Sequence, residues 1–142
     1  MHFEVRRQIR ATPARVWSCL TDTRRLVAGN LGVTRLEGEI APGAKLKLWS
    51  EAAPGRAFPL KVTMFEAPHR MTWEGGMPFG LFKGVRQFHL EPQEGGVLFH
   101  MREDYSGLLL GLIGKSLLDL TPSFEKFAAG LAALAESSGR QD

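Results

Sequence analysis

The sequence contains a single cysteine among 142 residues, so it cannot form an internal disulfide. It also lacks a long apolar run. The longest low-polarity stretch, residues 107–114, is far shorter than the roughly 20 residues that a membrane-spanning helix requires. No basic segment followed by an apolar one opens the chain, so nothing indicates secretion. We therefore expect a soluble, cytoplasmic protein without an integral membrane segment.

Internal repeats, low-complexity tracts and convincing linkers are absent as well, which predicts a single domain over residues 1–137 and a flexible tail over 138–142. The chain is 44% hydrophobic and 23% charged, which is enough apolar material for a core and excludes a disordered chain. Sixteen glycines and eight prolines favour many short elements joined by turns over a helical bundle.

Positive charge is concentrated near the start of the chain. Residues 1–35 hold seven arginines and two acidic residues. Such a region can attract phosphates, but these arginines are spread over a predicted strand, a helix and a loop, without interleaved aromatic residues or a recognition-helix pattern. We therefore predict a solvated positive face and no nucleic-acid partner.

Hydrophobic periodicity predicts an α+β protein. Residues 2–9 alternate as in a half-buried strand, and Thr12 followed by Pro13 predicts a helix over 13–20. Six short alternating runs joined by turns then favour an antiparallel meander up to about residue 101. From Thr121 and Pro122 onward, apolar residues recur at steps of three and four, which is typical of an amphipathic helix.

Several sequence blocks resemble one protein family. The segment Ile9-Arg10-Ala11-Thr12-Pro13, with Val16-Trp17 and Leu20-Thr21-Asp22, is similar to the opening of the START-like (SRPBCC) superfamily in its polyketide cyclase and dehydrase branch. Later blocks agree in order: Val62, residues 71–73, 84–92, 95–96, Glu103 and 106–109.

The resemblance implies a helix-grip fold like that of Bet v 1. In this fold a seven-stranded curved antiparallel sheet wraps a long C-terminal helix, two short helices lie between strands 1 and 2, and a cavity is left between sheet and helix. Members bind sterols, lipids, polyketides or plant hormones, and a minority catalyse cyclisation or dehydration. The branch often has histidine at the position of Arg86, and an arginine cannot serve as a proton shuttle.

Arg86 and Glu103 are the candidate polar residues. Alternation places each on an inward face, and a turn over residues 92–96 that pairs Leu90 with Phe99 also pairs Arg86 with Glu103. A lone buried charge is costly, so an ion pair is expected. The pair would either orient a polar group of a ligand or act only as a structural ion pair.

We predict that the ligand contacts apolar side chains of the strands, the last helix and a mobile lid over residues 108–118, together with this ion pair. The predicted ligand-binding residues are Leu60, Val62, Met64, Met71, Trp73, Phe82, Arg86, Phe88, Met101, Glu103, Leu112 and Phe127.

Other candidate motifs favour structural roles. His89 and His100 fall on the outward face without a third ligand at metal-site spacing, and alternation sends Glu103 and Asp104 to opposite faces. The loop predicted over residues 75–80 is glycine-rich but lacks the lysine of a phosphate loop. We therefore assign no catalytic residue, metal or cofactor.

Three functions remain open at this point. The first is a non-catalytic binder of a hydrophobic small molecule, such as a lipid, a polyketide or an aromatic compound. The second is a polyketide cyclase or dehydratase that uses the same cavity. The third is a chaperone-activator-like interaction module that would use outward-facing Trp49 and Phe65 together with the leucine segment. A homodimer is also left open.

Overall fold

The computed structural model describes residues 1–113 and 119–137, except for the side chains of residues 112 and 113. The strands are β1 (His2–Ile9), β2 (Val33–Glu37), β3 (Lys45–Ser50), β4 (Phe58–Glu66), β5 (Arg70–Met77), β6 (Phe82–Gln93) and β7 (Gly96–Ser106). The helices are α1 (Pro13–Leu20), α2 (Thr23–Ala28), α3 (Leu110–Ile113) and α4 (Thr121–Ser137).

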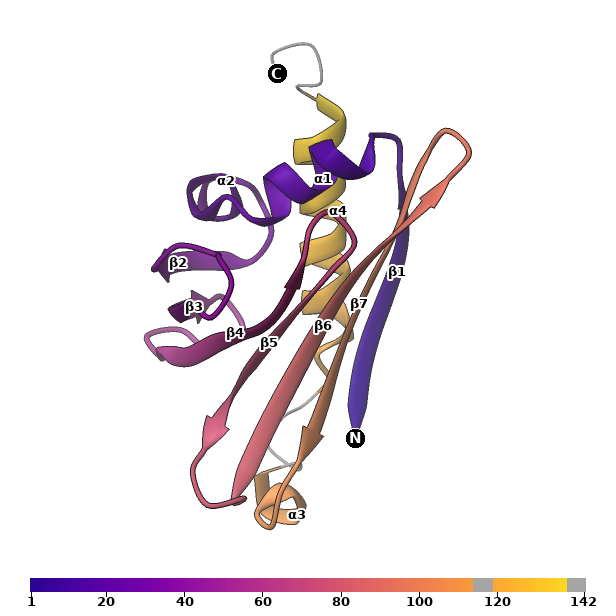
Figure 1. Cartoon of the computed structure of the whole chain (residues 1–142). Coiled ribbons are helices and arrows are strands. Elements are labelled where there is room, and N and C mark those ends of the chain that lie inside the picture. Colours follow the sequence, from indigo (N-terminus) through magenta and orange to yellow (C-terminus); the bar gives the residue numbers. More distant parts are fainter. Residues whose placement is uncertain (114–118, 138–142) are drawn as a thin grey trace.

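All seven strands form one antiparallel sheet in the order β1-β7-β6-β5-β4-β3-β2. Strands β2 to β7 follow one another as the predicted meander, and β1 pairs with the last of them. Figure 1 shows α1 and α2 at one end of the sheet and α3 at the other. This arrangement confirms the predicted α+β helix-grip architecture, including two short helices between the first two strands.

The two short helices begin at side chains that cap their first turns. The hydroxyl of Thr12 accepts a hydrogen bond from the Arg15 backbone N–H at 3.1 Å, and Pro13 is the first helical residue. The carboxylate of Asp22 accepts bonds from the N–H groups of Arg24 and Arg25 in the same way. These caps satisfy N–H groups that have no partner inside a helix.

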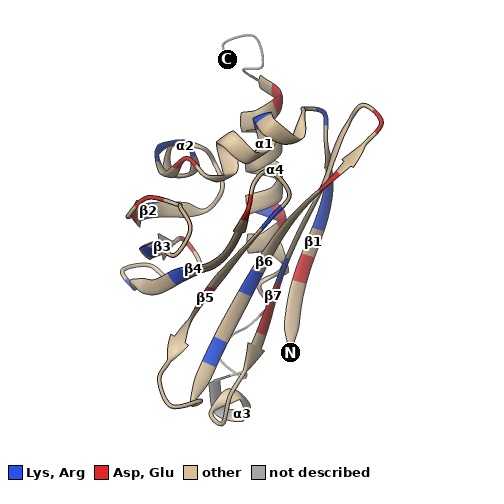
Figure 2. Ribbon diagram, viewed as in Figure 1, with Lys and Arg blue, Asp and Glu red and all other residues tan. Residues whose placement is uncertain are grey.

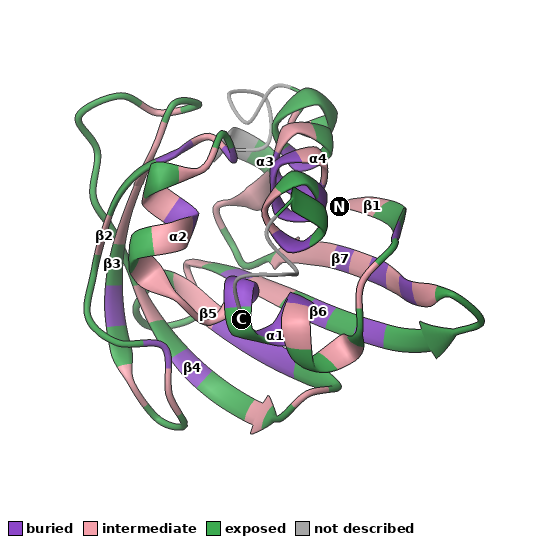
Figure 3. Cartoon of the chain, turned by 90° about the horizontal axis from the view of Figure 1, so that it is seen from above, coloured by how far each residue is buried: buried purple, intermediate pink, exposed green. Residues whose placement is uncertain are grey.

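Helix α4 lies on the concave side of the sheet, with α1 next to its C-terminal end (Figure 3). Its apolar stripe packs against the sheet, where the ring of Phe127 lies 6.0 Å from that of Phe88 and 6.3 Å from that of Phe99. The core consists of buried apolar side chains from the sheet, α1, α2 and α4, including Ile9, Leu20, Leu26, Met71, Trp73, Phe88, Leu90, Phe99, Met101 and Leu131.

The predicted pairing of β6 with β7 is confirmed. Leu90 lies opposite Phe99, Phe88 opposite Met101, and Arg86 opposite Glu103. The turn between the two strands has Gly95 at φ 80°, a conformation that glycine adopts without the steric cost of a side chain. Turn and hydrophobic alternation thus select the same register.

The predicted orientation of β4 beyond Val62 is wrong. Met64 was expected to face inward, but its side chain is 37% exposed, whereas Phe65 packs its ring 5.2 Å from that of Trp17. The pairing of β4 with β5 shifts between Val62 and Met64. A β-bulge at this point interrupts the two-residue period, so the following side chains change faces.

The loop predicted over residues 75–80 is shorter than expected. Strand β5 continues through Gly75 and Gly76 to Met77, and Gly75 pairs with Gly84 of β6. Glycine inside a strand often marks a place where a neighbouring group approaches closely.

No helix within the described part of the chain has the length and apolarity needed to cross a membrane.

Candidate functional site

One cross-strand row on the concave face collects the polar residues that the sequence singles out. Val62, Trp73, Arg86, Glu103 and Phe3 are successive partners on β4, β5, β6, β7 and β1. Cross-strand partners project to the same face of a sheet, so these five side chains share one side. Because Trp73 and Val62 are fully buried there, that side faces α4. The row therefore crosses the interior of the fold.

Arg86 and Glu103 form the predicted ion pair in this row. Nε of Arg86 donates a hydrogen bond to Oε1 of Glu103 at 2.7 Å, and the two side chains are 22% and 15% exposed. The guanidinium carbon of Arg86 also lies 4.9 Å from the ring centroid of Phe124 on α4. Arg86 thus joins β7 through a charge-assisted hydrogen bond and α4 through a cation–π contact.

Tyr105, which sequence reasoning did not select, lies beside this pair. Its ring stacks on Phe82 at a centroid distance of 5.8 Å and meets Phe3 edge-on at 6.2 Å. Burial raises the pKa of the Tyr105 phenol above its ordinary value, and the negative charge of Glu103 adds to this shift. The phenol therefore stays protonated at neutral pH. The signal was present in the sequence, since Tyr105 follows Glu103 by two residues and so shares its face.

Two glycines make room next to the ion pair. In the adjacent cross-strand row, Leu60 pairs with Gly75, Gly75 with Gly84, and Gly84 with Tyr105. A Cβ atom at Gly84 would lie 2.7 Å from Oε2 of Glu103 and 3.3 Å from the Tyr105 ring. Because Gly84 has no side chain, the Glu103 carboxylate and the Tyr105 ring can both lie against β6. This close approach explains the glycine at this strand position.

The indole N–H of Trp73 has no hydrogen-bond partner among the described residues, although the side chain is only 1% exposed. The ring packs edge-on against Phe88, with centroids 4.7 Å apart. A buried donor without an acceptor costs about 1–3 kcal/mol of stability. Such an orphan donor in the row of Arg86 marks a place where an acceptor from outside the chain would be favourable.

The predicted ligand-binding residues divide into three groups. Leu60, Phe82, Arg86 and Glu103 are half-buried around the glycines. Val62, Met71, Trp73, Phe88, Met101 and Phe127 are buried in a shared core closer to α1. Met64 projects from the opposite face, and the side chain of Leu112 lies outside the described residues. The concave face is therefore shielded from solvent near α1 and reached by solvent around Arg86 and Glu103.

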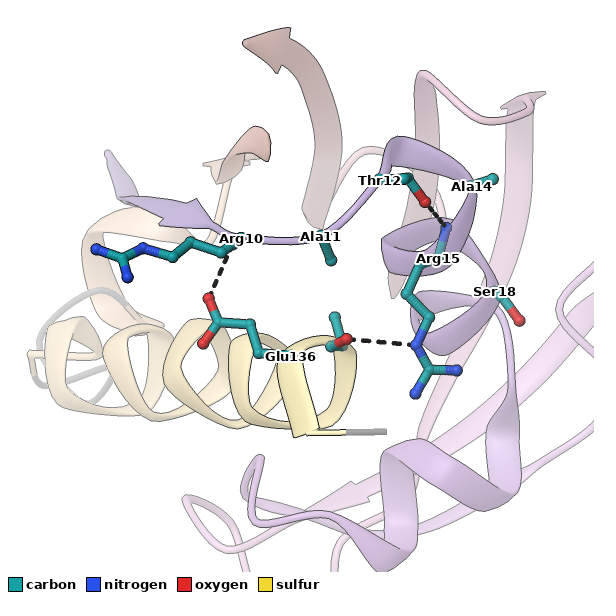
Figure 4. A pocket seen from close by; sticks show the side chains of 8 residues that line it. Arg10, Ala11, Thr12, Ala14, Arg15, Ser18 and Glu136 are labelled. Atoms are coloured by element: carbon teal, nitrogen blue, oxygen red, sulfur yellow. Dashed lines mark hydrogen bonds between the residues drawn. The ribbon is translucent and has the colours of Figure 1, made fainter. Parts of the chain in front are cut away.

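A separate hollow of about 550 Å³ lies between α1 and the end of α4, and Figure 4 shows its lining. Its polar groups connect elements of the fold. Arg15 donates through Nε to the carbonyl of Ala135 and through Nη2 to that of Leu134, while Glu136 accepts from the backbone N–H of Arg10 at 2.8 Å. The two bonds from Arg15 satisfy carbonyls that have no partner inside α4 at its C-terminal end. The polar groups that line this hollow therefore have structural roles.

A second hollow of about 490 Å³ lies along β3, β4 and β5 and is lined in part by Lys45, Lys47, Lys61 and Glu74. Leu60 and Gly75 also line it, so residues of both faces of the sheet contribute, whereas no residue of α4 does. Neither hollow is the cavity expected between the sheet and α4.

Residues of both charge signs lie along β1, β6 and β7 (Figure 2). As predicted, Asp104 and Glu103 separate. Asp104 pairs with Arg102 at 2.9 Å, whereas Glu103 turns inward to Arg86.

His89 and His100 are cross-strand neighbours, but His100 is half-buried and contacts Glu4 at 3.1 Å rather than being fully solvated. Among the described residues, no three histidine, cysteine or acidic side chains are placed to share a metal ion.

The leucine segment predicted to form a lid is only partly described. Leu108 is 82% exposed, and its N–H bonds to the Gly80 carbonyl at 3.1 Å, which places it beside the β5–β6 turn. Helix α3 follows, and residues 114–118 together with the Leu112 side chain lie outside the described residues. The lid therefore stays a prediction.

The architecture places the chain in the helix-grip class, and comparison with solved structures agrees. Protein MLL2253 from Mesorhizobium loti has a TM-score of 0.76 at 16% identity, covering 97% of this chain and 98% of that one. TTHA0849 from Thermus thermophilus gives 0.74 at 19% identity, with 97% and 99% covered. Truncated norcoclaurine synthase from Thalictrum flavum gives 0.72 at 14% identity, with 96% and 93% covered. At such identities these likenesses concern the fold alone.

A family model gives the finer assignment. The chain belongs to the family described as polyketide cyclase / dehydrase and lipid transport, whose model matches residues 1–136. Among curated proteins, none matches the sequence closely enough to indicate a relative. The family and the helix-grip fold together support a ligand-binding cavity in general terms.

Proposed function

We propose that the protein binds a small to medium hydrophobic molecule between the concave face of the sheet and α4. The observation that carries the proposal is the Arg86–Glu103 pair. Its charged groups are bonded at 2.7 Å on the face of the sheet that packs against the helix, yet both retain contact with solvent. A charge pair that is reached by solvent inside an apolar fold is typical of the polar end of a ligand site.

The surrounding side chains supply apolar surface for such a ligand. Phe82, Leu60 and Tyr105 are half-buried around Gly75 and Gly84, so they have apolar area still to lose on binding. Removing apolar surface from water contributes about 25 cal/mol per Å². The ion pair would then orient the ligand more than hold it.

The contacts of the candidate acid and base groups favour binding over catalysis. Glu103 is already bonded to Arg86, and an arginine does not release its proton. The Tyr105 phenol, with its pKa raised by burial, is a hydrogen-bond donor at neutral pH and not a base. A cyclase or dehydratase acting in the same place is the alternative, and it would require Glu103 to leave Arg86.

The interaction-module hypothesis loses its main support. Phe65 was expected to face outward, but it packs against Trp17 in the interior. Trp49 is half-buried and lies under the guanidinium of Arg35, 4.9 Å from the ring centroid. The predicted outward orientation is therefore wrong for Phe65, whereas Trp49 shares a face with Lys47 and is partly covered by Arg35.

Titration with the apolar fluorophore N-phenyl-1-naphthylamine tests the proposal. We expect saturable binding of one probe per chain, weakened at least tenfold by Phe82→Asp, because this substitution places a charge in the apolar wall. Met64→Asp is the matched control, since the same change on the opposite face should leave affinity unaltered. Native mass spectrometry of gently purified protein should also show a retained small molecule. Absence of saturable probe binding, or equal losses in both variants, would refute the proposal.

A further inference from the structure

Hydrogen-bond donors outnumber acceptors around the ion pair. The N–H of Trp73 is buried without a partner among the described residues, whereas the protonated Tyr105 hydroxyl shares the Glu103 carboxylate with Arg86. Arg86 carries five N–H groups, of which Nε–H is bonded to Glu103. The carboxylate that this inward-facing cluster contains, Glu103, is already engaged. An additional occupant that satisfies the cluster must therefore bring an acceptor.

The charges of Arg86 and Glu103 indicate which kind of hydrogen-bond acceptor would bind beside them. Arg86 and Glu103 carry opposite charges at 2.7 Å, so the pair is neutral as a unit. An anionic ligand group placed beside it would gain attraction from Arg86 but meet repulsion from Glu103. A neutral carbonyl oxygen accepts hydrogen bonds from the same donors without that repulsion. It also loses less hydration than an anion on entering an apolar site.

The position of Trp73 identifies the principal donor. Trp73 is the cross-strand partner of Arg86 on the side that faces α4, and its ring lies against Phe88 within the interior. Its N–H is therefore held on the same face as the ion pair, in surroundings too dry for bulk water to compete. A buried donor that the chain itself leaves unpaired discriminates strongly between ligands with and without an acceptor.

We propose that the ligand of this site is an apolar molecule with a neutral carbonyl oxygen, such as a ketone, and that the Trp73 N–H donates to this oxygen with support from Arg86. This inference rests on the proposed function, because it specifies the chemistry of the molecule held between the sheet and α4. It assigns Trp73 a role in specificity in addition to its place in the core.

Three naphthalene compounds with one body and different ends provide the test. They are 6-propionyl-2-dimethylaminonaphthalene, which has a ketone, its 6-propyl analogue, which lacks the oxygen, and the corresponding 6-carboxylate. We expect Trp73→Phe to weaken the ketone about tenfold, the loss of one buried hydrogen bond, and to change the propyl compound less than twofold. The carboxylate should bind unmodified protein more weakly than the ketone. Trp49→Phe is the matched control and should alter none of the three affinities.

A spectroscopic reading on the unmodified protein makes the result independent of variant folding. The three tryptophans give three indole N–H signals in a ¹⁵N–¹H correlation spectrum, and Trp73→Phe or the other single variants assign them. The ketone should move the Trp73 signal downfield, as expected for a new hydrogen bond, while the propyl compound should not.

The possible outcomes separate this inference from the proposed function. If neither the ketone nor the propyl compound binds, the hydrophobic site itself is refuted, and this inference with it. If both bind but Trp73→Phe affects them equally, or if the Trp73 signal responds alike to both, only the carbonyl assignment is refuted. Tighter binding of the carboxylate than of the ketone would overturn the neutral character of the ligand end.

Discussion

At the residue scale, the interaction between Arg86 and Glu103 connects neighbouring elements of the fold. Arg86 contacts Glu103 on β7 and Phe124 on α4, so its side chain joins two layers. Removing one member of a largely buried pair leaves the other charge without compensation, which costs more than the pair itself contributes. The coupling between Arg86 and Glu103 can therefore be measured from the free energy of unfolding of the protein without a ligand.

We expect Arg86→Met to lower the free energy of unfolding by about 2 kcal/mol, a value reduced from that of a fully buried pair because both side chains retain some contact with water. Adding Glu103→Leu should restore part of this loss, since no charge is then left unpaired. Urea denaturation of the two single variants and the double variant measures the coupling. Arg70→Met is the control, because the Arg70–Glu66 pair has the same 2.7 Å distance but lies about half exposed, and its loss should matter little. Strictly additive effects at 86 and 103 would contradict the pairing.

Tyr105 offers a second test at the scale of one residue, because it is the only tyrosine in the chain. Burial and the nearby Glu103 raise its pKa in the folded state, so the neutral phenol is favoured by folding. This contribution to stability is present below the ordinary tyrosine pKa near 10 and is lost as the pH rises beyond it.

The absorbance of tyrosinate at 295 nm should consequently rise at a higher pH in the native protein than in protein unfolded by urea. Circular dichroism recorded in parallel shows whether ionisation accompanies alkaline unfolding. A native titration midpoint at or below that of the unfolded chain would show that Tyr105 is not buried beside Glu103.

At the scale of elements, a glycine in α4 allows the helix backbone to lie close to the segment before β2. Gly130 lies on the face of α4 that meets the segment before β2, where an added Cβ would sit 2.7 Å from the Asn30 carbonyl oxygen and 2.7 Å from Cγ of Leu31. A backbone oxygen cannot move aside as a flexible side chain can. The glycine therefore permits the helix to lie at this distance.

We predict that Gly130→Ala destabilises the protein by about 1–3 kcal/mol, because overpacking outweighs the gain of up to about 1 kcal/mol in helix propensity. Gly111→Ala in α3 is the control, since open space surrounds that position and no destabilisation is expected. Thermal or urea unfolding of the two variants gives the comparison. Stabilisation by Gly130→Ala would mean that α4 sits farther from residues 30 and 31 than described.

At the scale of the molecule, one core connects the helices with the sheet. Buried side chains of α1, α2, α4 and the strands belong to a single cluster, and Trp17 and Trp73 lie within it while Trp49 is half-buried on β3. Elements that share a core are expected to unfold together. This property distinguishes one cooperative domain from two loosely joined parts.

Urea unfolding should therefore give one transition, with coincident curves for tryptophan fluorescence and for far-UV circular dichroism. Repeating the fluorescence measurement with Trp49→Phe removes the reporter nearest the β2 edge and should leave the midpoint unchanged apart from a small shift in stability. Separate transitions for the two signals would contradict a single cooperative unit over residues 1–137.

The sequence alone determined the order of the strands, the positions of α1 and α4, and the pairing of Arg86 with Glu103. Caps at Thr12 and the two-residue period of β6 and β7 are local signals, and a tight turn converts that period into a register. Tyr105 was accessible to the same reasoning through its distance of two residues from Glu103. These features could be predicted because each depends on residues close together in the chain or joined by one hairpin.

Only the tertiary structure decided the remaining features of the site. The bulge that turns Met64 outward and Phe65 toward Trp17, the strand positions of Gly75 and Gly84, and the unpartnered N–H of Trp73 all depend on groups from distant segments. A pattern along one strand specifies which face a side chain prefers. Whether that face is filled, open or short of an acceptor is set by the side chains that other elements place against it.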